Sequence, residues 1–337
     1  MGHINIPIFI PHLGCPNQCI FCNQRYISGT IEFKEADVER QIEQALSTYA
    51  GNDAEIAFFG GSFTGIDRDL MIRLLDIAQG YVNSKRVSAI RMSTRPDYIN
   101  EEILDILSRY TISCVELGLQ SINDEVLKYL KRGHTAEQAK TAIELLKKRK
   151  IPFVGQMMVG LPKATLEDEI NCARFICENG ACACRIYPTI VFRQTELADI
   201  AQSGGYEPLS LEDAVLRSAK VLKIFVDNGV YCLRIGLCES DNLHSSDSYV
   251  AGPNHPSIGE MVKSRLYLDV ILERLNNLIE PSKRIIISCP KSATSQVTGN
   301  KRKNILYLME LYGFQEIKIC ENETLDAYDI RIFNKED

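Results

Sequence analysis

The chain of 337 residues has no run of about 18 uncharged apolar residues, so the sequence predicts no membrane-spanning helix. Its N-terminus, MGHINIPIFI, has neither a basic region nor a small-residue cleavage site, which argues against a signal peptide. Twelve cysteines without an export signal indicate a reducing compartment, and we expect a cytoplasmic protein with no membrane partner. The net charge of −6 gives no overall attraction to nucleic acid, so such a contact requires a local basic patch.

Three of the cysteines lie close together near the N-terminus. Cys15, Cys19 and Cys22, in the segment GCPNQCIFCNQ, have the spacing C-x3-C-x2-C, and the aromatic Phe21 precedes the last of them. Three thiolates on one loop are suited to hold three corners of a [4Fe–4S] cluster. The fourth iron then has no protein ligand nearby in the sequence and is open to a small molecule, as in catalytic metal sites.

Two other interpretations of these cysteines fit the sequence less well. A structural zinc site normally has four ligands in two pairs, and the only nearby fourth candidate here is His12. A disulfide framework pairs its cysteines and forms in secreted chains, whereas this loop holds three cysteines and no secretion signal precedes it. The iron–sulfur cluster is therefore the favoured interpretation.

The cysteine spacing resembles the signature of the radical S-adenosylmethionine (SAM) enzymes. Four further segments, FFGGSFTGI, STRPDYI, VELGLQSINDEVLKYLKRGHT and RIYPTIVFRQTELADIAQSGGYEPLSLEDAV, closely resemble the radical domain of the Elongator catalytic subunit and its bacterial and archaeal relatives. The resemblance covers roughly residues 6–230, with the segments in the expected order. Oxygen-independent coproporphyrinogen III oxidase shares a looser version of the Gly-Leu-Gln-Ser and Arg-Gly-His elements.

Strands and helices alternate along the chain. Apolar runs predict strands over residues 4–11, 55–59, 87–92, 113–119, 152–159 and 182–187, with helices between them, and such alternation gives a parallel sheet. Alternation alone does not separate a barrel from an open Rossmann sheet, and the resemblance implies an α/β fold with a partial (β/α)6 radical-SAM barrel at residues 1–230. We expect residues 231–282 to close the barrel and residues 283–337 to form a small βαβ-like appendage.

Polar and glycine-containing motifs follow several predicted strands, and barrels of this kind carry their chemistry at the carboxyl ends of the strands. A plain turn is the alternative for Gly60 and Gly61, but glycine also lets a ligand approach the backbone. The resemblance implies that these glycines contact the methionine end of SAM, with Thr94, Gln120 and Gln156 near its sugar or adenine. The candidate cofactor-binding residues are Phe21, Gly60, Gly61, Ser62, Ser93, Thr94, Arg95, Gln120 and Gln156, and the candidate catalytic and metal-binding residues are Cys15, Cys19 and Cys22.

The resemblance implies a reaction as well. A [4Fe–4S] cluster on the three cysteines would pass one electron to SAM, which cleaves to methionine and a 5′-deoxyadenosyl radical. A reductant protein such as flavodoxin or ferredoxin is the expected electron donor, and tRNA, modified by wobble-uridine-like chemistry, is the expected substrate. Two alternatives stay open: a small-molecule substrate such as a porphyrin precursor, and a non-catalytic cluster-bearing RNA-binding protein. The oligomeric state is not predicted.

The chain departs from the Elongator pattern in three respects. Its first cysteine gap is shorter, Ser93 stands where those proteins usually carry glutamate, and about fifty residues follow Pro281, too few for an acetyltransferase domain. We therefore expect the radical machinery without the acetyl-CoA chemistry. Two C-terminal features admit a functional or a structural interpretation: a Gly/Pro-rich loop around His255, and the basic segment Lys301-Arg302-Lys303, which suits either phosphate contact or a solvated turn.

Overall fold

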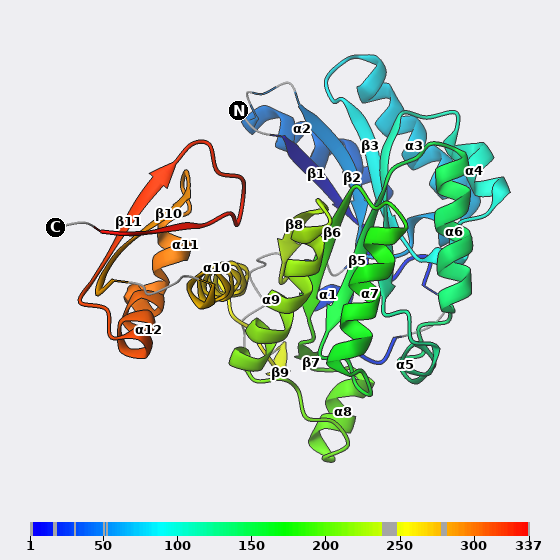
Figure 1. The fold of residues 1–337 in the computed structure, drawn as a ribbon. Helices are drawn as coiled ribbons and strands as arrows, with labels where there is room; N and C mark the ends of the chain where they lie inside the picture. Colours follow the sequence, from blue (N-terminus) through cyan, green and yellow to red (C-terminus); the bar gives the residue numbers. More distant parts are fainter. Residues whose placement is uncertain are drawn as a thin grey trace.

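The computed structural model describes residues 3–15, 19–29, 32–49, 51, 53–237, 248–277 and 282–335. Its main element is a curled sheet of seven parallel strands whose spatial order follows the chain (Figure 1). The strands are β1 (Ile4–Phe9), β2 (Ala54–Phe59), β3 (Ala89–Thr94), β4 (Ile112–Gln120), β5 (Phe153–Val159), β6 (Ala183–Pro188) and β8 (Tyr231–Ile235). Because all seven strands run the same way, their carboxyl ends lie along one edge of the sheet, beside the loop that carries the cysteines.

Helices cover the outer face of the curled sheet. They are α2 (Val38–Thr48), α3 (Arg68–Asn83), α4 (Glu101–Leu107), α6 (Ala136–Lys148), α7 (Leu166–Glu178) and α9 (Leu211–Asp227). Alternate side chains of each strand face them: Val115, Leu117 and Leu119 of β4 belong to the buried core shared with these helices. Glu116, between two of these core residues, therefore points to the inner, concave face.

The α/β fold with a partial barrel and a C-terminal appendage is confirmed, with one correction. The sheet has seven strands rather than six, because β8 begins at residue 231, where the sequence predicted the barrel to end. β8 is an edge strand with mostly exposed side chains, so it lacks the apolar run by which the six inner strands were recognised. The division of the remaining chain into a closing segment and an appendage stays a prediction.

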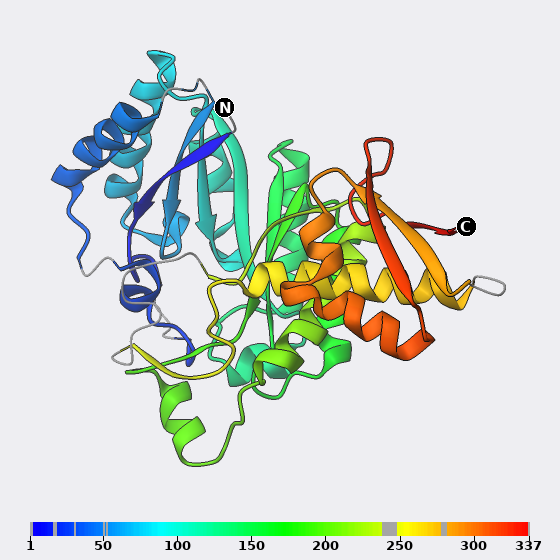
Figure 2. The same cartoon turned by 90° about the vertical axis from the view of Figure 1, so that its left-hand side faces the viewer.

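The appendage is a second, smaller layer attached through one long helix, α10 (Ile258–Asn276) (Figure 2). Its three-stranded sheet has the order β11-β10-β12, with β10 (Arg284–Pro290) parallel to β11 (Glu316–Asn322) and antiparallel to β12 (Arg331–Asn334). Between β10 and β11 lie α11 (Thr294–Thr298) and α12 (Lys303–Tyr312). Ile271 and Leu275 of α10 pack with Ile285 and Ile287 of β10 in one buried cluster, and this core joins the two layers.

Shorter elements lie around the carboxyl edge of the main sheet. They are the helices α1 (Gln24–Ser28), α5 (Asp124–Tyr129) and α8 (Glu196–Gln202), the paired strands β7 (Val191–Phe192) and β9 (Tyr249–Ala251), and the single-turn 3₁₀ helices η1 (Glu35–Asp37), η2 (Phe63–Gly65) and η3 (Pro96–Tyr98), with η4 (Asn300–Arg302) in the appendage. None of the helices formed by the described residues has the length and apolar character needed to span a bilayer.

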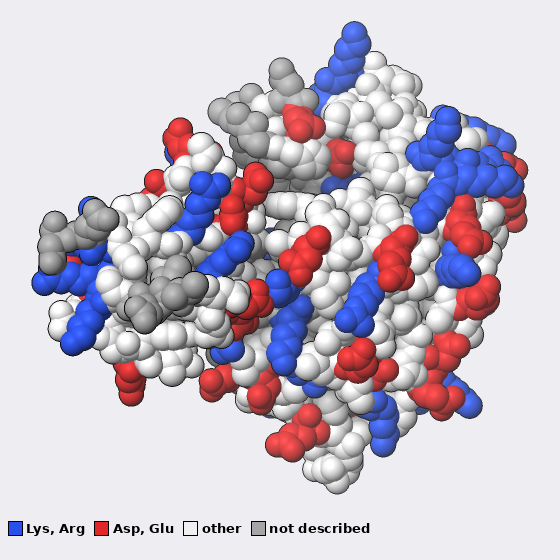
Figure 3. Space-filling model, in the orientation of Figure 1, with Lys and Arg blue, Asp and Glu red and all other residues white. Residues whose placement is uncertain are grey.

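Positive and negative side chains are mixed over most of the face seen in Figure 3. One gathering of lysine and arginine lies over α4 and α6, at the amino edge of the main sheet (Figure 3). Lys148 and Arg149 there bond to Glu101, and Arg149 also bonds to Asp105, so part of this charge is neutralised locally. These cations lie at the opposite edge of the sheet from the cysteine loop.

The contact between β5 and α7 gives a stability prediction. A Cβ atom added to Gly155 would lie 2.5 Å from Cγ2 of Ile176, a fully buried side chain. We expect Gly155→Ala to lower the free energy of unfolding by about 1–3 kcal/mol, because the tightly packed core has no room for the methyl group. Urea denaturation measures this change, and its size should fall in an Ile176→Ala background, where the clash is removed.

Gly80 provides the matched control. It lies in the interior of α3, is exposed, and would have open space around an added Cβ atom. Gly80→Ala should therefore raise the free energy of unfolding by roughly 0.5–1 kcal/mol, because alanine is the better helix former. Equal effects of the two substitutions would contradict the packing argument.

Candidate functional site

The three predicted cluster cysteines lie on a loop that leaves the carboxyl end of β1. The loop turns at His12, whose φ is +60°, and the His12 Nε2 atom accepts a hydrogen bond of 3.0 Å from the backbone N–H of Gln24. This bond joins the two ends of the cysteine segment. His12, the fourth-ligand candidate of the zinc interpretation, thus serves as an anchor of the loop through one ring nitrogen.

The loop lies directly against the turn that follows β2. The N–H of Ser62 donates to the carbonyl of Leu13 (3.1 Å), and the N–H of His12 donates to the carbonyl of Gly60 (3.0 Å). A Cβ atom on Gly61 would lie 2.4 Å from the Leu13 carbonyl oxygen. The two predicted glycines therefore allow close backbone contact with the cysteine loop, and Gly60 also takes a positive φ of +90°.

Each cysteine sulfur has one polar neighbour. Cys15 Sγ lies 3.5 Å from Ser62 Oγ, and Cys22 Sγ accepts from Gln24 Nε2 at 3.4 Å. Burial, followed by the neighbouring Cys19 thiol, raises the pKa of Cys22 to about 12, and Cys15 contributes in the same direction. Binding of a metal would therefore have to displace the proton of the Cys22 thiol.

The arrangement differs from that of a mononuclear metal site. Among the described residues, no three His, Cys, Asp or Glu side chains converge on a point where one ion would bind. A cubane cluster does not require the three cysteine sulfurs to meet at one point, because each cysteine ligates a different iron. The donor set of three spaced thiols thus fits a cluster better than a single zinc ion.

Phe21 has a packing role in the structure. It packs, partly buried, against a small apolar cluster that contains Ile20, Leu130 and Leu197. The backbone N–H of Ile20 donates to the carbonyl of Leu130 (3.2 Å), and that of Leu197 donates to the carbonyl of Ile20 (2.8 Å). The middle of the cysteine loop is thereby attached to the end of α5 and the start of α8. A direct contact of Phe21 with a cofactor stays a prediction.

The predicted residues after β3 are held in place by their neighbours. Thr64 donates its hydroxyl proton to the Tyr98 carbonyl, so the 2.7 Å contact between the Thr64 and Thr94 hydroxyls must use the proton of Thr94. Thr94 can therefore only accept a further bond. Arg95 donates twice to Asp97 (2.9 and 2.7 Å), but its buried Nη1 atom has no partner.

Two residues that the sequence analysis did not select, Arg132 and His134, lie beside Gln120 at the end of β4. Arg132 donates to the Gly118 carbonyl (2.7 Å) and to Cys19 Sγ (3.4 Å). Five buried polar atoms with no hydrogen-bond partner among the described residues gather here: Arg95 Nη1, Gln120 Oε1, Arg132 Nε, and His134 Nδ1 and Nε2. Buried polar groups are normally paired, so this corner has the open donors and acceptors that a polar ligand requires.

The signal for these two residues in the sequence is the Arg-Gly-His element, which belongs to the resemblance but was not among the candidate site residues. Both belong to the segment KRGHT, directly after α5, and neither is part of a strand end. Gln120, which was selected, has a φ of +67° at an irregularity in the pairing of β4 with β5. Such a conformation is uncommon outside glycine, so the surrounding structure must hold Gln120 in it.

The surroundings of His134 keep its side chain uncharged. Burial lowers its pKa to about 3, from an ordinary value of 6.5, and the positive charges of Arg132 and Arg95 act in the same direction. The Leu119 backbone acts in the opposite direction and is the smallest of these influences on the pKa. His134 is therefore neutral in the folded protein near pH 7.

Gln156 and Ser93 lie on the strands themselves. Gln156 is half-buried, in register between Gly118 of β4 and Arg185 of β6. Ser93 Oγ makes one long contact of 3.5 Å with the Phe58 carbonyl. The structure thus brings Ser62 and Arg95 near the cysteine loop and Gln120 beside its Arg132 neighbour, while Gln156 lies along the concave face.

A buried charge network forms the inner part of that concave face. Glu116 of β4 accepts two bonds from Arg185 of β6 (2.7 and 3.0 Å) and pairs with Arg91 of β3 at 3.2 Å. Arg91 also pairs with Glu55 of β2 at 3.4 Å. The network ties four strands together from inside the barrel. Its signal in the sequence is a charged residue within each of four otherwise apolar strands.

The C-terminal features lie in the second layer of the structure. Lys301, Arg302 and Lys303 are exposed at the start of α12, and none pairs with a carboxylate of the described residues. His255 is exposed before α10, and its Nδ1 accepts from the N–H of Ser257 (3.0 Å). Contacts of these residues with RNA or substrate stay predictions.

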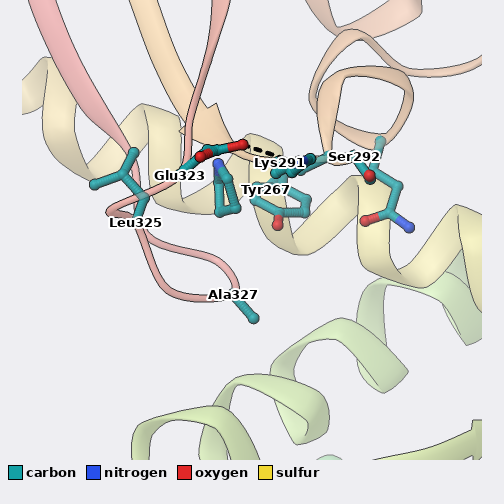
Figure 4. Close-up of a pocket in the computed structure, with 9 residues that line it drawn as sticks. Tyr267, Lys291, Ser292, Glu323, Leu325 and Ala327 are labelled. Carbon is teal, nitrogen blue, oxygen red and sulfur yellow. Dashed lines mark hydrogen bonds and ion pairs between the residues drawn. The ribbon is translucent and has the colours of Figure 1, made fainter.

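A surface hollow in the same layer lies at the carboxyl ends of β10 and β11, as Figure 4 shows. Its wall includes Tyr267, Lys291 and Glu323. Lys291 donates to Glu323 (2.7 Å), and the Tyr267 hydroxyl accepts from the N–H of Tyr328 (3.2 Å). These groups are already engaged with each other or with the backbone, in contrast to the open polar atoms beside the cysteine loop.

The contact between Gly14 and Ser62 gives a second prediction. Gly14 has a φ of +69°, and an added Cβ atom would lie 2.1 Å from the Ser62 carbonyl oxygen. Gly204 has a similar φ of +79° but open space around it. We expect Gly204→Ala to cost about 1–2 kcal/mol from the left-handed backbone alone. Gly14→Ala should cost about 1–3 kcal/mol more, because two backbones must separate.

Urea denaturation of both variants, without added metal, measures the difference. Iron and sulfide content after reconstitution provides a second readout, since only Gly14→Ala should displace the cysteine loop and reduce cluster content. Equal costs for the two glycines would show that the loop does not depend on this contact.

The depressed pKa of His134 predicts a dependence of stability on pH. The unfolded state takes up this proton near pH 6.5, whereas the folded state resists it until about pH 3, so stability is lost as the pH falls between these values. At pH 5 the loss from this group is about 2 kcal/mol. Between pH 7 and pH 5, the His134→Gln variant should lose that much less unfolding free energy than the parent, as measured in urea. Equal losses would indicate that His134 is accessible to protons.

The chain was then compared with known proteins. The family model of the radical SAM superfamily matches residues 9–176, and the model of the radical SAM C-terminal domain matches residues 182–268. The first match contains the cysteine loop, both glycines of the β2 turn and the open polar corner. Together the two matches cover most of the chain.

Several relatives are similar over the same region. An uncharacterized protein of Methanocaldococcus jannaschii is 30% identical over 219 residues, which are 60% of this chain and 66% of the relative. The tRNA uridine(34) acetyltransferase of the same organism is 32% identical over 184 residues, 49% of this chain and 34% of that protein. Human Elongator complex protein 3 is 30% identical over 190 residues, 50% of this chain and 35% of that protein. The chain thus spans between about a third and two thirds of the length of these relatives.

Among solved structures, the archaeal Elp3 of Methanocaldococcus infernus, with residues 1–46 deleted, aligns with a TM-score of 0.62 at 21% identity. The alignment covers 79% of this chain and 63% of that chain, and it supports the partial-barrel fold. The resemblance to the Elongator radical domain is confirmed by the relatives above. From its two family matches and its fold, the chain belongs to the radical SAM superfamily, whose enzymes use a [4Fe–4S] cluster and SAM.

Proposed function

We propose that this enzyme binds its [4Fe–4S] cluster through Cys15, Cys19 and Cys22 and modifies tRNA. The observation that carries the first part is the loop of three cysteines, of which Cys19 has its sulfur 3.4 Å from Arg132 in a buried corner with open polar atoms. When bound, the cluster supplies an electron that cleaves SAM to methionine and a 5′-deoxyadenosyl radical. The protein holds the cluster, orients SAM and excludes water.

The SAM site is assigned to the carboxyl edge of β2 to β5. Gly60, Gly61 and Ser62 form the turn that packs against the cysteine loop, and the methionine end of SAM is assigned to this turn. The Ser62 side chain belongs to this turn and also contacts the cysteine loop, because its hydroxyl lies 3.5 Å from Cys15 Sγ. These contacts support placing the methionine end of SAM next to the cluster.

The remaining SAM contacts are assigned to the polar corner and the concave face. Arg95 Nη1 can donate, Gln120 Oε1 can accept, and Thr94 can accept, according to the bonds each already makes. These properties support contacts with the ribose hydroxyls and the carboxylate of SAM. Gln156 and Ser93, deeper on the concave face, are assigned to the adenine or to the substrate.

The tRNA substrate rests on the relatives rather than on surface charge. The name of one relative, 32% identical over 184 residues, states an activity on tRNA uridine 34. The chain itself has a net charge of −6, and the gathering of cations in Figure 3 lies at the far edge of the sheet from the proposed site. Contact with RNA would therefore depend on local basic groups near the site, such as Lys128 and Lys163, both exposed.

The test uses anaerobically reconstituted protein with dithionite and SAM, with and without bulk tRNA, and measures 5′-deoxyadenosine. We expect tRNA to increase its formation at least tenfold, since an enzyme suppresses radical formation until the substrate is bound. The Cys19→Ala variant should form none. Cys172→Ala is the matched control: it removes another buried cysteine, on helix α7, and should retain full activity.

The other outcomes distinguish the alternatives. Slow cleavage that does not respond to tRNA would contradict the tRNA assignment and favour a small-molecule substrate, such as a porphyrin precursor. No 5′-deoxyadenosine from protein with an intact cluster would contradict the catalytic assignment as a whole. Full activity of the Cys19→Ala variant would show that the cluster lies elsewhere.

A further inference from the structure

Arg132 makes a direct contact with one of the three proposed cluster ligands. Its side chain is 8% exposed, and its Nη1 atom lies 3.4 Å from Cys19 Sγ. Its Nη2 atom donates to the Gly118 carbonyl at 2.7 Å, at the end of β4. The two bonds use both arms of the planar guanidinium, so its orientation toward the sulfur is fixed by the main sheet.

The charge of Arg132 has no carboxylate partner within the described part of the chain, unlike that of the other buried arginines. Arg95 pairs with Asp97 and Arg185 pairs with Glu116. Burying a charge without a counterion lowers the free energy of unfolding by a few kcal/mol. An opposite charge nearby is normally needed to offset this cost. The nearest group able to supply one is the Cys19 sulfur, once it becomes a thiolate.

We infer that Arg132 is a positioning residue that raises the reduction potential of the cluster. The inference rests on the proposed cluster at the three cysteines. Reduction adds one negative charge to an anionic thiolate-ligated cluster, and both a hydrogen bond to a ligating sulfur and a nearby positive charge stabilise the reduced form. Arg132 supplies both at Cys19. It therefore makes the cluster easier to reduce by the electron donor.

The Nε atom of the same side chain is one of the open polar atoms of the corner assigned to SAM. A residue that served only to bind SAM would leave the potential of the SAM-free cluster unchanged. The measurement is therefore made without SAM, which separates the two roles.

The experiment is a redox titration of the full-length, reconstituted protein without SAM, followed by the electron paramagnetic resonance signal of the reduced cluster. Arg132→Gln removes the charge and shortens the side chain, and we expect a clearly lower midpoint potential. Arg132→Lys keeps the charge but cannot bond to both Gly118 and Cys19, so its potential should lie between those of Arg132→Gln and the parent. Lys131→Gln is the matched control: it removes the adjacent charge, which is exposed and paired with Glu196, and should leave the potential unchanged.

The signal reports only on intact clusters, so partial loading of a variant does not alter the midpoint. If Arg132→Gln holds no cluster, the Arg132→Lys variant decides, and a potential equal to that of the parent overturns the inference. A normal potential in both variants with weaker SAM binding also overturns it, but leaves the proposed function intact. A parent protein that binds no iron or sulfide contradicts the proposed function itself.

Discussion

The candidate site depends on one backbone contact, that between the cysteine loop and the turn after β2. The Leu13 carbonyl and the Ser62 carbonyl each lie where a side chain on the facing residue would clash, so Gly61 and Gly14 must both lack one. The N–H groups of Ser62 and His12 complete the contact with hydrogen bonds across it. The positions of all three cysteines follow from this junction, together with the attachment of Ile20 to α5 and α8.

The buried arginines of the concave face and Arg132 at the carboxyl edge of the barrel differ in whether they pair with a carboxylate. On the concave face, Glu116 and Glu55 neutralise Arg185 and Arg91 across four strands, so the network is largely satisfied within the protein. At the carboxyl edge, Arg132 has no carboxylate partner in the part of the chain that the structure describes, and several polar atoms around it have no hydrogen-bond partner there. Such groups destabilise a fold unless something binds to them. Among the described residues, Arg91 Nε on the concave face and Ser218 Oγ on α9 are also buried without a hydrogen-bond partner, so the corner differs from the rest of the interior by how many open polar atoms it gathers.

The second layer of the structure shares a core with the barrel through α10 but not the chemistry of the site. Ile271 and Leu275 pack against β10, and the hollow of Figure 4 has its lysine and glutamate paired with each other. The layer therefore stabilises the side of the barrel beyond β8. Its exposed segment 301–303 remains the part of it best suited to a phosphate, a prediction that the fold does not test.

The sequence by itself determined the features that local pattern encodes. The spacing of Cys15, Cys19 and Cys22, the alternation of apolar strands with helices, and the glycines after β2 can each be recognised within a short window, because spacing and periodicity are local properties. Only the tertiary structure decided that Arg132, 113 residues away in the chain, bonds to Cys19, and that His134 lies buried beside it. It also added β8, whose exposed edge position removes the apolar pattern that would have revealed it. Contacts of this kind depend on how strands are ordered and how the sheet curls, which no local pattern specifies.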